Sequence, residues 1–329
     1  MSEFADLILG AFDRVQARAS SIDLAPDAFA VEAVREGYYV GSSADGALAL
    51  LVETTPVRSQ PAPTRLEYLS ASYGIQCDLH EQTSARKVRV SKLLCVDVGP
   101  GTRDLFATVC AAIADKLGRE PTEQQFADEI ARWATLFWRL GQSVATDLVG
   151  LVGELAVISC MDDPAFWIAA WHSSPGEVLD FEFGGSGTSV EVKATRGAAR
   201  EHSLSLEQVS SRDEHVRYFA SVLVDLSDSG QAIGQLVREI SDRLVDDVSR
   251  LRFWDILTKT CGIELEETLA RRIETSKILS SVQFYPAWLV PRPDVGLPLP
   301  KGVRSVKFTS DFTVVPAVDR TAVSQALRG

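Results

Sequence analysis

The residues 177–197, EVLDFEFGGSGTSVEVKATRG, most constrain how this chain can fold. Apolar and polar residues alternate in both halves of this stretch, as they do in strands with one buried face. A glycine- and serine-rich loop joins the halves, which predicts an antiparallel hairpin that turns at Gly185 and Ser186. In that register Asp180 faces Glu191 directly across the hairpin.

This register brings two carboxylates, those of Asp180 and Glu191, close together. Directly opposed residues have Cβ atoms only ~5 Å apart, and two carboxylates at that separation repel unless a cation lies between them. Mg²⁺ is a suitable cation because it prefers carboxylate oxygens and water as ligands. Lys193 lies two residues after Glu191 and therefore shares its face, where it could orient a water or hold a phosphate oxygen. Such a site suits phosphodiester hydrolysis.

A second interpretation is an edge hairpin with a solvated, charged face. The spacing of Asp180, Glu191 and Lys193 alone favours this second interpretation, because such short patterns recur by chance. Three features of the context favour a site instead: both segments alternate as strands do, the same register pairs Glu182 with Ser189 around a glycine-rich turn, and an acidic residue stands on the helix before the hairpin.

That acidic residue is Glu154, in the stretch DLVGLVGELAVISCM, for which the apolar spacing predicts a buried helix. A carboxylate in so apolar a helix is costly without a partner, and a metal-bound water would be one such partner. An ordinary solvated glutamate is the alternative. The glycines Gly150 and Gly153 beside it allow close approach of another backbone.

The rest of the chain predicts two domains, as its 329 residues suggest. Alternating segments dominate residues 1–101, a β-rich N-terminal module that could dock a partner or read DNA. Helical spacing then begins in residues 102–329, the domain that holds the hairpin. The fold class expected there is α/β (α+β), with a mixed sheet flanked by helices.

Several elements follow from local patterns. Asp45 and Gly46 predict a hairpin turn, and Thr122 with Gln125 predicts a capping box. The pattern predicts one long helical stretch over about 230–257, another helix over 264–279, and a helical turn after the hairpin. The aromatic residues expected in the core of the helix after Thr122 are Phe126, Trp133, Phe137 and Trp138.

Charge and cysteine usage limit the functions that the chain can have. The net charge of −12 argues against a protein that coats nucleic acid nonspecifically, although an enzyme could still meet DNA at one local site. Five scattered cysteines without a CxxC pair favour free thiols. The sequence shows no signal peptide and no membrane span, so the expected location is the cytoplasm.

The pattern of Asp180 followed by Glu191-Val192-Lys193, with Glu154 on the preceding helix, resembles the PD-(D/E)XK phosphodiesterase superfamily. It is most similar to the PD-(D/E)XK motif endonucleases encoded near bacterial restriction and phage-defence genes. The matching segments are GLVGEL, VLDFEF, VEVKAT and REHSLSLEQ, followed by a long strand. Leu179 replaces the motif's proline, at a position that varies widely in the superfamily.

The resemblance implies a restriction-endonuclease-like core with an intact site. Asp180 and Glu191 would be metal ligands together with the main-chain carbonyl of Val192. Lys193 would be the catalytic lysine, and Glu154 the accessory acid. The implied cofactor is Mg²⁺, for which Mn²⁺ would substitute, and the implied products carry a 5′-phosphate and a 3′-hydroxyl.

Residues after the lysine are candidates for contacts with DNA. Arg196 and Arg200 could contact phosphates, and His202 could hydrogen-bond a phosphate or shuttle a proton; surface charge and an exposed loop histidine are the alternatives. Ser205 and Gln208 have the spacing of a capping box, while the resemblance implies that Gln208 lines the site.

The sequence therefore predicts a Mg²⁺-dependent DNA endonuclease of a restriction-modification or phage-defence system. The alternative is a noncatalytic assembly or DNA-recognition subunit on the same fold, which the acidic net charge favours. The resemblance implies DNA, an ATPase or helicase-like protein and a methyltransferase as partners, and no membrane. The sequence does not choose between DNA and RNA, or between a monomer and a homodimer, and it leaves open the sequence specificity and the need for partner proteins.

Overall fold

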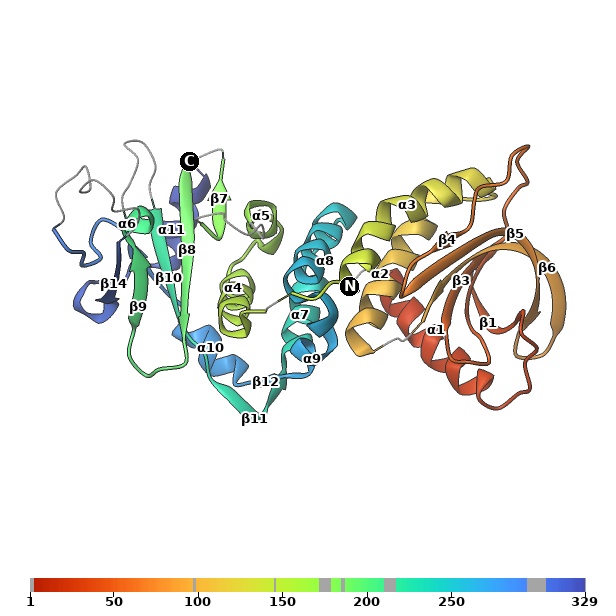
Figure 1. Cartoon of the computed structure of the whole chain (residues 1–329), viewed down its shortest axis with the longest axis horizontal. Coiled ribbons are helices and arrows are strands. Elements are labelled where there is room, and N and C mark those ends of the chain that lie inside the picture. Colours follow the sequence, from red (N-terminus) through yellow and green to blue (C-terminus); the bar gives the residue numbers. More distant parts are fainter. Residues whose placement is uncertain are drawn as a thin grey trace. The chain divides into compact units, whose positions relative to one another are not determined.

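The computed structural model describes residues 3–96, 99–144, 146–171, 179–184, 187–209, 217–294 and 306–328. Contacts between residues divide the chain into two compact units. Unit 1 comprises Met1–Val144 and Val245–Glu266, and unit 2 comprises Ala145–Leu244 and Glu267–Gly329. Figure 1 shows the elements of each unit, coloured along the chain.

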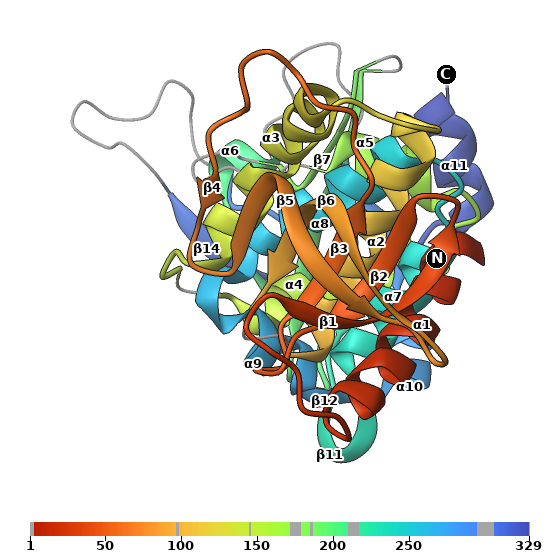
Figure 2. The same cartoon turned by 90° about the vertical axis from the view of Figure 1, so that its right-hand side faces the viewer.

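Unit 1 contains a sheet that closes on itself. β1, β2, β3, β6 and β5 pair in that order through antiparallel ladders, and β5 then pairs in parallel with β1. Figure 2 shows the curvature of these strands. Apolar side chains from successive strands, including Phe29, Leu51 and Leu79, fill the interior. The strands are β1 (Ala28–Arg35), β2 (Tyr38–Ser42), β3 (Leu48–Val52), β4 (Thr64–Arg65), β5 (Leu69–His80) and β6 (Ala85–Cys95).

Helices pack against this sheet within unit 1. α1 contacts β1, β2 and α2, and α3 contacts β5, α2 and α8. The predicted capping box is confirmed at the start of α3: Thr122 accepts from the Gln125 amide, and the Gln125 side chain accepts from the Thr122 amide. The helices are α1 (Glu3–Ala19), α2 (Pro100–Leu117), α3 (Glu123–Leu140), α8 (Asp247–Cys261) and η1 (Gly262–Glu264).

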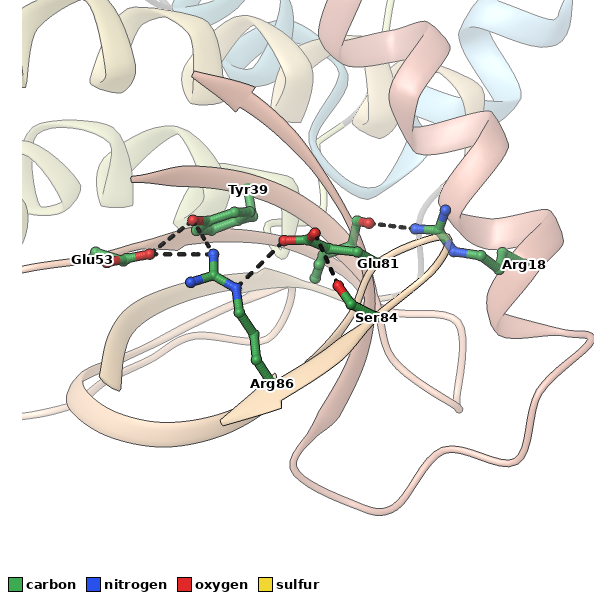
Figure 3. Close-up of polar contacts among 7 residues, drawn as sticks. Arg18, Tyr39, Glu53, Glu81, Ser84 and Arg86 are labelled. Atoms are coloured by element: carbon green, nitrogen blue, oxygen red, sulfur yellow. Dashed lines mark hydrogen bonds and ion pairs between the residues drawn. The ribbon is translucent and has the colours of Figure 1, made fainter. Parts of the chain in front are cut away.

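A polar network joins neighbouring strands of the closed sheet (Figure 3). The Tyr39 hydroxyl on β2 donates to Glu53 at 2.7 Å, and Arg86 on β6 donates to the same hydroxyl. Arg86 also lies 3.5 Å from both Glu53 and Glu81. These contacts are partly exposed, so they contribute less to stability than the apolar interior does.

Unit 2 is built on a mixed sheet in the order β13-β10-β8-β7. β8 is antiparallel to β7 and parallel to β10, and β10 is antiparallel to β13. Parallel neighbours need a crossover, and β9 with the short helix α6 lies in that connection. The strands are β7 (Phe181–Phe183), β8 (Thr188–Thr195), β9 (Glu201–Ser205), β10 (Arg217–Leu223), β11 (Leu226–Ala232), β12 (Arg272–Ile273), β13 (Gln283–Pro286) and β14 (Lys307–Asp311).

Helices flank this sheet. α4 packs on β8 and β10, α10 packs on β10, and α11 contacts β8 and β13. Asp147 caps the start of α4 by accepting a hydrogen bond from the Gly150 amide at 3.1 Å. The helices are α4 (Leu148–Cys160), α5 (Pro164–Ala170), α6 (Leu206–Val209), α7 (Ile233–Asp242), α9 (Leu265–Ala270), which spans the division between the units, α10 (Thr275–Ser281), η2 (Phe312–Val314) and α11 (Arg320–Arg328).

Close contact between α4 and β8 depends on a glycine. A Cβ atom added at Gly153 would lie 2.7 Å from the Ala194 Cβ and 3.2 Å from a Val192 methyl carbon. The first distance is shorter than packed carbons tolerate. The helix that carries Glu154 therefore approaches the strand that carries Glu191 and Lys193 because residue 153 has no side chain.

The predicted fold class is confirmed: the chain is a mixed α/β protein with a helix-flanked mixed sheet, preceded by a β-rich region. The boundary expected near residue 101 falls within unit 1, between β6 and α2, because α2 and α3 pack with α1 and the closed sheet. The compact units therefore divide the chain elsewhere, and the assignment of functional domains to 1–101 and 102–329 stays a prediction.

Three local predictions were wrong. The stretch 230–257 is not one helix, because residues 226–232 form β11 and Asp246 caps a separate helix, α8, through the Ser249 amide. The stretch 264–279 is interrupted by β12, which pairs with β11. Trp138 is 55% exposed and does not belong to the core, unlike the other three aromatic residues of α3.

None of the helices in the described ranges combines the length and the apolar character that a membrane span requires.

We expect Gly153→Val to destabilise unit 2 by about 1–3 kcal/mol, because the added methyl groups overpack the contact between α4 and β8. Chemical denaturation measures this loss. Gly184→Ala is the matched control, since nothing lies within 4 Å of a Cβ atom at that position. Equal stability of the two variants would contradict the close packing of α4 on β8.

Candidate active site

The hairpin formed by β7 and β8 has the register that the sequence predicts. Glu182 pairs with Ser189, and Phe183 pairs with Thr188. Asp180 immediately precedes β7 and is thus in step with Glu191. The predicted turn residues 185–186 and the first residues of the predicted strand, 177–178, lie outside the described residues.

Asp180 is fixed by the backbone of the opposite strand. Its Oδ2 accepts a hydrogen bond from the Val192 amide at 2.6 Å. In an extended strand the N–H and C=O of one residue point to the same side. The Val192 carbonyl therefore points toward the side of β8 on which Asp180 lies.

Glu191 and Lys193 share a face of β8, as predicted. The Lys193 Nζ lies 2.8 Å from the Glu191 Oε1, and the Lys193 side chain is 18% exposed. Glu191 is buried at 4% exposure. Its second oxygen, Oε2, is buried and has no hydrogen-bond partner. Such an orphaned carboxylate oxygen is costly and is available to a ligand.

Glu154 joins this group from α4. Its Oε2 accepts a hydrogen bond from the indole Nε1 of Trp171 at 2.6 Å. Trp171 follows α5 directly, is 1% exposed and stacks on Phe181 of the hairpin. Glu154 is therefore partnered, and the interpretation of a freely solvated glutamate does not hold.

Gln208 has both of the roles that the sequence left open. It forms the capping box with Ser205: its Oε1 accepts from the Ser205 amide at 3.0 Å, and its own amide donates to the Ser205 hydroxyl at 3.3 Å. Its Nε2 also donates to the Glu191 Oε1. Gln208 thus ties the start of α6 to the carboxylate on β8.

Burial perturbs all three carboxyl groups. Burial, followed by the charges of Asp180 and Glu191, raises the pKa of Glu154 well above its ordinary value. Burial also raises the pKa of Asp180, although the Val192 amide and Lys193 oppose this. Burial and the Asp180 charge raise the pKa of Glu191 to about 7. The cluster therefore retains protons near neutral pH, and a cation that binds there must displace them.

The oxygen atoms at this site are the kind of ligands that Mg²⁺ usually takes in proteins. Mg²⁺ takes one or two carboxylates and completes its shell with water and substrate oxygens. Asp180, Glu191 with its orphaned Oε2, and the Val192 carbonyl supply that set. Within the described ranges, no group of three or more His, Cys, Asp or Glu side chains is arranged to hold a metal ion.

The structure does not bring every predicted DNA contact to this site. Arg200 is buried, and its guanidinium donates to the Ser221 carbonyl and hydroxyl and to the Ser281 carbonyl. His202 lies on β9 rather than in an exposed loop, is 3% exposed, and hydrogen-bonds the Ser221 hydroxyl at 2.7 Å. Arg196 is exposed beyond the end of β8. Phosphate contacts by these residues stay predictions.

The environment of His202 keeps its imidazole neutral. Burial, followed by the nearby charges of Lys193 and Arg200, lowers its pKa to about 4. The interpretation of His202 as an exposed histidine was wrong because residues 201–205 pair with β14 as a strand. The sequence interpretation expected only a helical turn in this region.

Trp171 contacts the candidate site and was missed by sequence reasoning. The available signal was indirect: Asp163 and Pro164 have the pattern of a helix start, and Trp171 ends that helix. Its contact with Glu154 spans 17 positions in sequence, which no local pattern predicts.

A comparison with protein families identifies the class of this chain. Residues 32–313 match the family described as "Putative PD-(D/E)XK family member, (DUF4420)". The match covers most of the chain, so the chain belongs to this family, and its core has a nuclease-type fold. The curated proteins and the solved structures give no match to this chain.

We expect the stability of the metal-free protein to fall as the pH rises from about 5 to about 8. The folded state holds the Glu191 proton up to a pKa of about 7, whereas the ordinary value is 4.5, so the unfolded chain releases its proton first. The loss is on the order of 3 kcal/mol. Denaturant unfolding in the presence of a chelator measures it.

Glu191→Gln removes one of the titrating groups and should make this pH dependence shallower. Glu182→Gln is the matched control, because Glu182 is an exposed acid on the same hairpin. If Glu191→Gln loses stability with pH as steeply as the wild type does, Glu191 does not hold a proton in the folded state.

Proposed function

We propose that this protein is a Mg²⁺-dependent DNA endonuclease with its active site at Glu154, Asp180, Glu191 and Lys193. The observation that supports the proposal best is that Glu154 of α4 lies beside Asp180, Glu191 and Lys193 of one hairpin in a PD-(D/E)XK family member, where burial raises the pKa of all three carboxyl groups. Buried charges of one sign are rarely tolerated for structural reasons alone. Perturbed carboxyl groups next to a lysine are typical of active sites.

Each side chain has a role that follows from its contacts. Asp180 and Glu191, with the Val192 carbonyl, would hold the ion. When bound, Mg²⁺ polarises the phosphodiester and lowers the pKa of the attacking water. Lys193, 2.8 Å from Glu191, would orient that water or contact a phosphate oxygen. Glu154, held by Trp171, is the accessory acid beside them.

The reaction breaks the bond between the phosphorus and the 3′ oxygen. The oxygen of water becomes bonded to phosphorus, which gives a 5′-phosphate, and the leaving 3′ oxygen takes a proton. The resemblance to endonucleases of restriction and phage-defence loci supports a role in such a system, together with an ATPase or helicase-like protein and a methyltransferase.

We expect the protein to nick or cut plasmid DNA with Mg²⁺ or Mn²⁺. Asp180→Ala and Lys193→Ala should each lower the rate by about 100-fold or more, because each removes a group that acts on the reacting atoms. Gel analysis of plasmid forms measures the rate. Glu182→Ala and Lys307→Ala are matched controls, since both positions are exposed and lie on strands of the same unit.

Absence of cutting by the wild type with either metal, even after the partner proteins are added, would contradict the nuclease function. It would favour a noncatalytic assembly or recognition subunit on the same fold. Equal cutting by the wild type and both alanine variants would instead show that the activity arises from a contaminant.

We expect Trp171→Phe to lower cleavage by about 10-fold while the fold is retained, because the aromatic packing on Phe181 remains but the hydrogen bond to Glu154 is lost. The Trp171 hydrogen bond lowers the pKa of Glu154. Its loss should therefore move the rise of the pH–rate profile to higher pH, which separates a positioning role from a structural one.

Trp167→Phe is the matched control for this profile. Trp167 is a buried tryptophan of α5 that packs on Phe181 and Phe183. A pH profile that moves equally in both variants would show that Trp171 acts through packing alone.

A further inference from the structure

A hollow of about 330 Å³ opens in unit 2 beyond the carboxyl end of β8. This volume lies at the lower end of the range for small-ligand sites. Side chains of the β8–β9 connection, of β11 and of the segment leading to β12 line it. We call it the arginine pocket; its lining residues are Arg196, Leu226, Ser227, Asp228, Ala270, Arg271 and Arg272.

The arginine pocket is positively charged on an acidic chain. Three arginines and one aspartate line it, a net charge of 3 − 1 = +2, whereas the whole chain carries −12. A local reversal of sign in an acidic protein concentrates anions at that place. The pocket is therefore suited to a negatively charged ligand.

The guanidinium groups are arranged to accept such a ligand. Arg272 is fixed by a hydrogen bond of 2.8 Å from its Nη1 to the Gly230 carbonyl. Across the described ranges, neither Arg196 nor Arg271 forms a side-chain ion pair or hydrogen bond with the protein. Guanidinium forks match the geometry of phosphate oxygens and bind them in a bidentate way.

The distance to the candidate active site suits a nucleic-acid strand. Arg196 follows Lys193 by three residues in an extended segment, which places their Cα atoms about 10 Å apart. A strand whose scissile phosphate lies at Lys193 would bring a neighbouring backbone phosphate to the arginine pocket. Contacts to phosphates position a strand without reading its sequence.

We propose that the arginine pocket binds a backbone phosphate of the nucleic-acid strand that is cut at Asp180, Glu191 and Lys193. This inference rests on the proposed nuclease function. It assigns Arg271 and Arg272, which are distant in sequence from the catalytic motif, to the grip on the substrate, together with Arg196. The pocket then supplies part of the positive charge that the acidic chain otherwise lacks.

The test measures binding without cleavage. Fluorescence anisotropy of labelled DNA of about 20 nucleotides, single-stranded and duplex, is recorded with the full chain in EDTA at several salt concentrations. We expect Arg271→Gln to weaken binding by about 10-fold and to reduce the slope of log K against log salt by about 1. Arg271→Lys keeps the charge and should restore most of the slope but not all of the affinity.

Arg328→Gln is the matched control. It removes one positive charge from the last residue of α11, which is exposed. Figures 1 and 2 place the C-terminal end of the chain at the opposite end of unit 2 from β11. This variant should bind DNA with the affinity and the salt slope of the wild type.

Other outcomes would overturn the proposal. If Arg271→Gln binds DNA with the same affinity and salt slope as Arg328→Gln, the arginine pocket makes no phosphate contact. If ATP or inorganic phosphate binds the wild type but not Arg271→Gln, while DNA binding is unchanged, the pocket serves a free phosphate compound instead of a strand.

Cleavage assays on the same variants separate this inference from the proposed function. If the wild type cuts DNA and Arg271→Gln binds DNA as tightly as the wild type, the nuclease function is retained. The proposed phosphate contact at the arginine pocket is then wrong. If Arg271→Gln binds DNA more weakly but the wild type does not cut DNA, the nuclease function is wrong. A phosphate contact at the arginine pocket is then retained, but it does not serve cleavage.

Discussion

The burial of three neighbouring carboxyl groups is the constraint on which the rest of the site depends. Glu154, Asp180 and Glu191 approach from a helix and the two arms of a hairpin, and burial raises the pKa of each. Lys193 offsets part of this cost through its contact with Glu191. Trp171 and the Val192 amide stabilise the other two carboxyl groups. One Glu191 oxygen remains unsatisfied, which leaves room for a cation.

The fold imposes this costly arrangement through ordinary packing. The pairing of β7 with β8 sets Asp180 in step with Glu191, and β8 is held on its other edge by the parallel strand β10. The absence of a side chain at Gly153 allows α4 to approach β8. The apolar contacts on these elements supply the free energy that keeps the carboxyl groups together.

Short-range patterns were sufficient to predict the central part of this account. Alternation and a glycine-rich turn specified the hairpin register, the apolar spacing around Glu154 marked a carboxylate on a buried helix, and the order of the elements indicated the mixed sheet. Capping boxes at Thr122 and Ser205 were recognisable because all their atoms come from four consecutive residues. The strands β9 and β11 were missed, because strand pairing with β14 and β12 overrides local helical spacing. The break between α7 and α8, where Asp246 caps α8, was also missed. The burial of Arg200 and His202 around Ser221 and the contact of Trp171 with Glu154 also depend on distant segments, which one sequence does not reveal.

Calorimetric titration of the protein with Mg²⁺ or Mn²⁺ tests the central claim most directly, when it is repeated near pH 6 in buffers of different ionisation enthalpy. A cluster that shares protons must release them when a cation binds. The account predicts one bound ion per chain with proton release near pH 6, and loss of both in Asp180→Asn. Binding without proton release, or unchanged binding in Asp180→Asn, would contradict the claim that these carboxyl groups form the metal site.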